Sequence, residues 1–353
     1  MSTLLDTHPS GYHLSTVIKA AIHLAFYGFL RPGSIGIQGK IHHMKYENYM
    51  KNNSGSVTVI LLSGFQDLHS LGSFFFLILL LTYCVTICGN LLIIVVVSYS
   101  RSLHSPMYFF LTQLSFSDIL LSTTVVPNML HVVLYEGGFV SFIACLVQYY
   151  FFSMSEILET LLLTVMSYDR YQAICNPLRY SMVMNPKFCL RALVFFWVII
   201  FVVILMISVT MSQLQFCGPS TIDHFFCDLA PILELSCSDT FIIKTQSTIF
   251  MIPLAICPFT VILISYIYII VAILKIPSTT GRQKTFSTCS SHLAVVSLYY
   301  GSTITIYLFP NKATTTKILS LIYTVVTPLL NPIIYSLNNG EITQALKKLR
   351  IPH

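Results

Sequence analysis

The chain has 353 residues, of which 55% are hydrophobic and only 9% are charged, whereas a soluble domain carries about 25% charged residues. With a mean hydropathy of +0.77, this composition excludes a soluble globular protein and predicts a polytopic helical membrane protein. The net charge of +6 calls for no nucleic acid, because the basic residues gather at one set of helix ends, where a membrane protein needs them.

Seven apolar runs are long enough to cross a bilayer, which takes about 20 mainly apolar residues per helix. The connections between them are short except at 214–244, which holds three cysteines and four acids. We therefore predict an all-α membrane protein built as a seven-transmembrane helix bundle. In chain order the runs are Phe74–Tyr99, Pro106–Leu130, Cys145–Tyr171, Ala192–Gln213, Thr245–Leu274, Phe286–Phe309 and Ile318–Leu337.

Lys and Arg are distributed unequally between the two sets of connections. The positive-inside rule assigns the richer set to the cytoplasm, so we expect the N-terminus outside and the C-terminus inside the plasma membrane. The opposite inter-helix loops hold only Lys244, Lys312 and Lys317. The richer set holds Arg101, Arg170, Arg179, Lys187, Arg191, Lys275, Arg282, Lys284, Lys347, Lys348 and Arg350.

The runs divide the chain into three parts. Residues 1–56 are expected to be a disordered extracellular segment, 57–338 the seven-span domain, and 339–353 a cytoplasmic tail with a short amphipathic eighth helix. Residues 1–43 are atypical, and two interpretations remain: a signal peptide, or an extension upstream of a working start at Met44 or Met50. Asn52 begins a glycosylation sequon on the outer side.

Four cysteines fall on the outer side: Cys145, Cys217, Cys227 and Cys237. Disulfides persist in that oxidising compartment, so we expect two bridges. The sequence alone allows three pairings.

Three acids, Asp118, Glu156 and Glu159, lie inside the runs. Charges in hydrocarbon are costly, so such residues normally face the bundle interior and are candidate functional groups. Glu156 and Glu159 share one helix face, and two carboxylates so close in a low dielectric do not both ionise. The competing interpretation is structural: the acids only bond hydroxyls or amides of neighbouring helices, with Asn90 and Asn331 as candidate partners.

Asp169 and Arg170 interrupt the end of the third run. Arg170 is 25 residues after Cys145, about 37 Å along a helix, so the pair emerges at the cytoplasmic surface. In "NPIIY", Asn331 is expected to occupy carbonyls that Pro332 leaves free, making the last helix a candidate two-state element. No catalytic motif is present, and we expect no enzyme activity, cofactor or metal.

Several stretches, in order and on the expected spans, resemble the vertebrate olfactory receptors, a subfamily of rhodopsin-like G-protein-coupled receptors. The resemblance covers about residues 57–350. The stretches are "GN" at 89, "PMYFFLTQLSFSDI" from 106, "MSYDRYQAICNPLRY" from 166, "HFFCDLAPILELSCSD" from 224, "SY" at 265, "KTFSTCSSHL" from 284 and "PLLNPIIYSLNN" from 328.

This resemblance implies the pairing Cys145–Cys227 and Cys217–Cys237. It also implies small organic odorants as ligands, bound in the helix bundle, and a stimulatory olfactory-type G protein that raises cyclic AMP. Asp169 would hold Arg170 at rest, and on activation Arg170 would meet the G protein. The residues implied in activation and coupling are Asp169, Arg170, Tyr171, Tyr266, Asn331, Pro332 and Tyr335, and Asn90, Asp118 and Glu159 would form an interior polar or ion site.

The wall of the ligand site that the resemblance implies is apolar and aromatic with a few hydroxyls. Tyr300 corresponds to the family's switch aromatic. Glu156 departs from the family pattern, where a small residue is common, and suggests a preference for amine-bearing or strongly hydrogen-bonding odorants. The implied wall consists of Phe152, Ser153, Glu156, Ile157, Phe250, Met251, Leu254, Tyr300, Thr303, Ile304 and Tyr307.

Two alternatives to an odorant receptor remain. One is a receptor of the same architecture that senses a metabolite outside the nose, which only the expression site can separate. The other is a small transporter or channel, which the hydropathy also fits. Transporters usually show internal repeats or paired broken helices, and the sequence shows neither.

Overall fold

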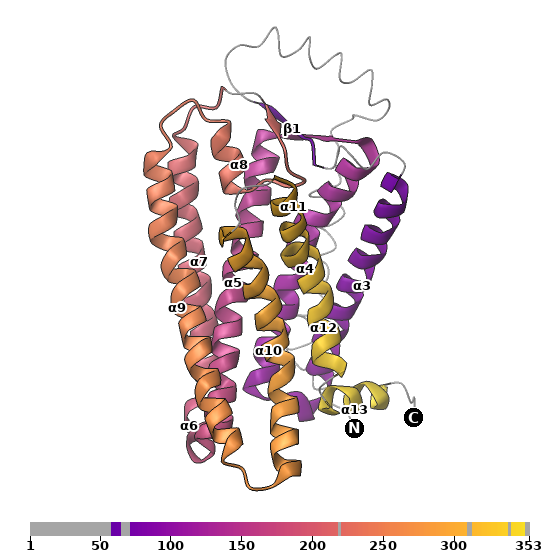
Figure 1. The fold of residues 1–353 in the computed structure, drawn as a ribbon, viewed down its shortest axis with the longest axis vertical. Coiled ribbons are helices and arrows are strands. Elements are labelled where there is room, and N and C mark those ends of the chain that lie inside the picture. The colour runs from indigo at the N-terminus through magenta and orange to yellow at the C-terminus, as the bar shows by residue number, and fades with distance from the viewer. Residues whose placement is uncertain (1–57, 65–70, 218–219, 309–312, 338–339, 350–353) are drawn as a thin grey trace, which may run out of the picture. The chain divides into compact units, whose positions relative to one another are not determined.

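The structure is a computed structural model that describes residues 58–64, 71–217, 220–308, 313–337 and 340–349. The predictions for residues 1–56, including the signal peptide and the Asn52 sequon, lie outside these residues. Long helices dominate the described part (Figure 1), and each of the seven apolar runs coincides with one helical stretch. These are α3 (Gly72–Tyr99), α4 (Pro106–Tyr135), α5 (Phe142–Cys175), α7 (Pro186–Ser212), α9 (Phe241–Leu274), α10 (Thr279–Leu308), and α11 (Ala313–Leu321) with α12 (Thr327–Leu337).

Two of the long helices, α5 and α7, begin at local caps rather than at the start of their apolar runs. The predicted fourth run begins at Ala192, but α7 begins at Pro186 because the Asn185 side chain accepts a hydrogen bond from the Phe188 amide at 2.9 Å. Proline at the first helical position supports this start, since its missing N–H would be unbonded there anyway. Ser141 caps α5 in the same way.

Five described helical stretches are long and apolar enough to cross a membrane: Gly72–Tyr99, Pro106–Tyr135, Pro186–Ser212, Phe241–Leu274 and Thr316–Ser336. The remaining two long helices, α5 and α10, are too polar to meet that criterion. α5 packs against α4, α7, α9 and α10, and a helix enclosed by others needs no continuous apolar surface. Its polar residues are largely buried between helices.

The last long stretch is interrupted by a π-helical turn, Ile322–Val326, before α12. Pro332 leaves the Pro328 carbonyl without its helical N–H partner. The structure corrects the prediction here: Asn90 of α3, not Asn331, donates to the Pro328 carbonyl at 3.0 Å. Gly89 makes this reach possible, because a Cβ there would lie 3.2 Å from the Pro332 ring, and glycine lets the two backbones approach.

The tail forms a helix, α13 (Gly340–Leu349), at the end of α12 (Figure 1). Ile342 and Ala345 are buried against the main apolar cluster, whereas Gln344 and Lys347 are exposed. Tyr108 of α4 donates a hydrogen bond to the Glu341 carboxylate at 2.8 Å. The helix therefore has an apolar face packed on the bundle and a polar face turned outward.

A small sheet, which the sequence did not predict, joins three distant segments. β1 (Val59–Leu62) pairs antiparallel with β2 (Gly138–Ser141) and parallel with β3 (Thr221–Ile222). The chain turns directly after β1 at Gly64, whose φ is +36°. A Cβ there would come within 2.6 Å of a Val132 methyl group, so only glycine fits this turn. The sheet thus fastens the segment before α3 to the long loop that follows α7.

Candidate ligand site and signalling end

The long loop between α7 and α9 is anchored to α5 by a disulfide and an amide. Cys145 and Cys227 are bonded, with Cα atoms 5.4 Å apart, and Cys217 bonds Cys237 within the loop. These are the pairs that the family resemblance implies. Gln148 accepts a hydrogen bond from the Cys227 amide at 3.0 Å and donates to the Thr124 carbonyl at 2.8 Å. The loop, α4 and α5 are therefore held together at one end of the bundle.

The residues before Cys227 place two aromatic rings among α3, α4, α5 and the π-helical turn. Phe225 and Phe226 are fully buried, and the Phe226 ring lies 4.8 Å from that of Phe152 on α5. Phe152 also approaches Tyr323, at 6.2 Å between ring centroids. One residue of the predicted wall thus contacts both the loop between α7 and α9 and the π-helical turn of the last long stretch.

An ion pair ties the same loop to α11. The Lys317 ammonium lies 2.6 Å from the Asp223 carboxylate and donates to the Gly64 carbonyl at 2.8 Å. Partial burial acts to raise the pKa of Asp223, but the Lys317 charge and the Ser63 hydroxyl hold it below its usual value. Burial lowers the pKa of the neighbouring His224 to about 4, and the Lys317 charge acts in the same direction.

Acidification is expected to destabilise this loop between about pH 6.5 and pH 4. An unfolded His224 takes up its proton near pH 6.5, whereas the native side chain stays neutral down to about pH 4. Stability contributed by the neutral form is therefore complete above that window and is lost as pH falls, by about 2 kcal/mol at pH 5. Thermal unfolding of the detergent-solubilised protein at pH 7 and pH 5 measures this loss. His224→Gln should abolish the difference, and His104→Gln, at an exposed histidine, should preserve it; an unchanged difference in His224→Gln would contradict the assignment.

Midway along α5, Glu156 meets the hydroxyl of Tyr299 on α10. The Tyr299 hydroxyl lies 3.4 Å from Glu156 Oε2, 3.1 Å from the Glu156 carbonyl and 2.7 Å from the Thr160 hydroxyl. The other carboxylate oxygen, Oε1, is buried and has no hydrogen-bond partner among the described residues. A buried acceptor left unpaired is costly, so this oxygen is open to a donor that enters the bundle.

The other two interior acids, Asp118 and Glu159, lie where α4, α5 and α12 approach one another. Asn331 donates to both carboxylate oxygens of Asp118 at 3.0 Å, which confirms Asn331 as a partner of an interior acid. Glu159 is close enough to interact electrostatically with Asp118. Asn90, the other predicted partner, instead bonds the Thr86 and Pro328 carbonyls. The interior polar site was predicted to combine Asn90, Asp118 and Glu159. In the structure Asn331, not Asn90, bonds Asp118, and Asn90 bonds backbone carbonyls of α3 and α12.

The remaining wall residues divide between two depths. Phe250 and Leu254 of α9 pack against the cluster that contains Cys145 and Cys227. Tyr300 is buried deeper, with its ring 4.8 Å from that of Phe259. Ser153 and Ile157 are also buried, Met251 and Thr303 are half-buried, and the side chain of Tyr307 lies outside the described residues. Ile304 is 39% exposed, so the bundle does not enclose this predicted wall residue.

At the opposite end of α5, Asp169 and Arg170 are held by two contacts. Asp169 Oδ1 accepts a hydrogen bond from the Tyr180 hydroxyl at 2.9 Å, and its Oδ2 lies 4.0 Å from Arg170 Nε. The Tyr171 ring lies 5.8 Å from that of Tyr268 on α9. The acid is thus anchored to the short segment after α5 while the arginine is held only loosely by it.

Tyr266 links α9 to α10 and α5 through His292. The Tyr266 hydroxyl lies 2.7 Å from His292 Nδ1, and His292 Nε2 lies 3.1 Å from the Leu163 carbonyl. Both ring nitrogens are therefore bonded, and three helices are pinned at one point. Tyr335 of α12 is buried nearby, close enough to Tyr266 and Arg170 to interact electrostatically.

Gln148, Tyr180, His292 and Tyr299 are among the residues of these contacts that were not predicted from the sequence. Each is a polar side chain whose importance depends on a partner far along the chain. Only His292 carried a signal, since a histidine inside an apolar run must find partners for its ring nitrogens, but the sequence does not say which ones.

Comparisons with known proteins agree with this geometry. The family model described as olfactory receptor matches residues 79–351. Human olfactory receptor 11L1 is 48% identical over 303 residues, covering 84% of this chain and 93% of its own length, and mouse olfactory receptor 1M1 is 44% identical over 300 residues, covering 84% and 96%. The crystal structure of squid rhodopsin matches with a TM-score of 0.61 at 17% identity, covering 79% of this chain and 84% of that one.

The resemblance seen in the sequence motifs is therefore confirmed, and the similarity to rhodopsin supports the fold. Olfactory receptors are not enzymes, in agreement with the lack of catalytic motifs. The chain belongs to the olfactory receptor family of G-protein-coupled receptors.

Proposed function

We propose that this protein is an odorant receptor of the plasma membrane that binds small organic molecules inside the helix bundle and activates a stimulatory olfactory-type G protein, raising cyclic AMP. The observation that carries the proposal is the course of α5. This one helix holds Glu156 beside Tyr299 in its middle and Asp169–Arg170 near its end. A ligand that favours one arrangement of α5 and α10 shifts the state of both regions.

The proposed topology is seven spans with the N-terminus outside and α13 as an amphipathic eighth helix on the cytoplasmic side. The asymmetry of Lys and Arg supports this orientation. Both disulfides lie at the end of the bundle that would face the oxidising exterior. α5 and α10 would span as enclosed helices, with their polar residues turned toward other helices.

The ligand site is proposed between α5, α9 and α10 beneath the loop that Cys227 anchors. Tyr300 and Phe259, which pack together, would transmit ligand contact to α9 and α10. The unpaired Oε1 of Glu156 gives the site an acceptor that an ammonium group satisfies with a charge-assisted hydrogen bond. We therefore favour amine-bearing odorants as the preferred class.

Glu156→Gln tests this preference. The amide keeps the size of the side chain and a partner for Tyr299 but removes the capacity for negative charge. The half-maximal concentration for amine odorants should rise about tenfold to a hundredfold, as expected for losing a hydrogen bond to a charged group, while neutral odorants of the same shape should respond as before. Glu234→Gln, at an exposed loop carboxylate, is the matched control. Unchanged amine responses in Glu156→Gln would rule out the amine preference.

The proposed function itself is tested by an odorant panel in cells that carry a cyclic-AMP reporter and this receptor. We expect at least one odorant to raise cyclic AMP only when a stimulatory G protein is present. A transporter or channel of the same hydropathy would instead show a flux of the compound or of ions that is independent of the G protein.

A further inference from the structure

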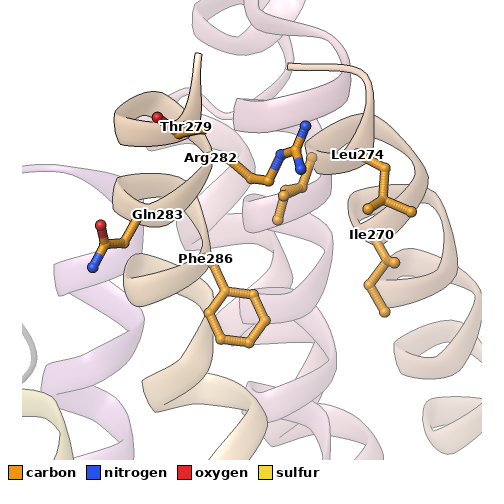
Figure 2. Close-up of a pocket in the computed structure, with 7 residues that line it drawn as sticks. Ile270, Leu274, Thr279, Arg282, Gln283 and Phe286 are labelled. Carbon is orange, nitrogen blue, oxygen red and sulfur yellow. The ribbon is translucent and has the colours of Figure 1, made fainter. Parts of the chain in front are cut away.

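A groove lies between the connected ends of α9 and α10 (Figure 2). Figure 1 shows this connection at the opposite end of the bundle from β1 and α8. The groove has a volume of about 350 Å³. Ile270, Ile273 and Leu274 line it from α9, and Arg282 and Phe286 line it from α10. This groove is separate from the ligand site, which lies near the middle of α5.

The groove opens outward rather than into the bundle. Of the residues that line it, Ile273 is buried, whereas Ile270, Leu274 and Phe286 are largely exposed. In a protein that spans a bilayer, an exposed apolar surface of this kind faces lipid chains. The groove therefore offers an apolar surface on which an acyl chain can lie.

Arg282 gives one end of the groove a positive charge. Figure 2 shows its side chain extending from α10 toward Leu274 on α9. One guanidinium nitrogen donates to the Ile276 carbonyl at 3.2 Å, and Arg282 forms no ion pair with any described residue. Lys275, exposed at the end of α9, adds a second charge. Between Asp239 and Glu341 the sequence contains no acid at all, so neither α9 after its start nor α10 supplies a carboxylate to pair with these charges.

We propose that this groove binds an anionic phospholipid of the cytoplasmic leaflet, with one acyl chain between α9 and α10 and the headgroup phosphate on Arg282. The proposal uses the orientation given above but not the identity of the odorant. Phe286 is one turn from Arg282, about 6 Å along the helix, which places the apolar sides deeper than the charge. Arginine pairs with phosphate in a bidentate way, and anionic lipids concentrate in the cytoplasmic leaflet.

Native mass spectrometry of the full-length receptor, released from nanodiscs, tests the proposal. Nanodiscs are made of phosphatidylcholine alone or of phosphatidylcholine with phosphatidylserine. The wild type should retain phosphatidylserine in preference to phosphatidylcholine. Arg282→Gln should reduce this preference about tenfold, as for a lost charged hydrogen bond, and Arg191→Gln, at an exposed arginine of α7 outside the groove, should leave it unchanged.

A second variant distinguishes the contribution of the apolar groove from that of the Arg282 charge. Ile270→Trp fills the apolar cleft while Arg282 stays in place, and it should also release the retained lipid. Odorant-evoked cyclic AMP in each variant reports whether the protein is folded. Equal retention of the two lipids by the wild type, or retention by both variants equal to that of the wild type, would overturn the proposal. Displacement by soluble glycerophosphoserine as efficient as by the lipid would also overturn it, since it would indicate a phosphate site without an acyl groove.

Discussion

Arg170→Ala is expected to abolish odorant-evoked cyclic AMP while leaving odorant binding unchanged. Arg170 lies near the end of α5, held by a contact of 4.0 Å to Asp169 and close to Tyr266 and Tyr335. Glu156, which contacts Tyr299, lies about 20 Å away from it along α5. Because Arg170 is proposed to contact the G protein, its loss should remove coupling to the G protein and leave odorant binding intact. Radioligand or fluorescent-odorant binding, measured beside cyclic AMP, separates the two effects.

Asp169→Ala, in contrast, should raise signalling in the absence of odorant. It removes the partner of both Arg170 and the Tyr180 hydroxyl, so the resting arrangement loses contacts that the active one does not need. If those contacts favour the resting state by about 1 kcal/mol, basal signalling rises about fivefold. Tyr180→Phe, which loses the 2.9 Å hydrogen bond alone, should give a smaller rise. Basal cyclic AMP at matched surface expression measures it, and a fall in basal signal for Asp169→Ala would contradict this role.

Cys145→Ser is expected to remove folded receptor from the cell surface. The Cys145–Cys227 bond closes a separation of 82 residues, and a loop of that length contributes about 4.5 kcal/mol through the entropy of the unfolded chain. Its loss would also free the segment with Phe225 and Phe226, which are fully buried between α5 and the last long helix. Surface staining and thermal unfolding measure the effect.

Two comparisons make the disulfide prediction specific. Cys217→Ser opens a bond with a separation of only 20 residues, so its cost should be lower, about 3 kcal/mol. Cys84→Ser, at an exposed free cysteine of α3, should leave expression unchanged. Normal expression and unfolding temperature in Cys145→Ser would show that the loop is held by its noncovalent contacts instead.

The long helices were predictable because apolar runs and their interruptions are local features. Five of the seven runs meet a length and hydropathy criterion in the structure, and the other two coincide with α5 and α10. The sheet was not predictable, because β1, β2 and β3 are four, four and two residues long. Strands this short leave no readable alternation, and each forms only because partners far along the chain are brought beside it.

The interior polar contacts show the same limit. Composition identified Asp118, Glu156 and Glu159 as groups that need partners, but not which partners they have. Asn331 was a candidate partner both for the interior acids and for the carbonyls that Pro332 leaves free. It bonds Asp118, while Asn90 reaches across to the Pro328 carbonyl. The close approach of α3 and α12 at Gly89 determines that Asn90, rather than Asn331, bonds the Pro328 carbonyl. Such a packing distance is a property of the tertiary structure and cannot be read from either asparagine.

The most direct test of the account is cyclic AMP production in cells that lack endogenous stimulatory G proteins, with the receptor and the olfactory-type G protein supplied separately or together. An active odorant should raise cyclic AMP only when both are present, and Arg170→Ala should remove that response. An odorant response without the G protein, or one that persists in Arg170→Ala, would contradict the claim that α5 carries the signal from ligand to G protein.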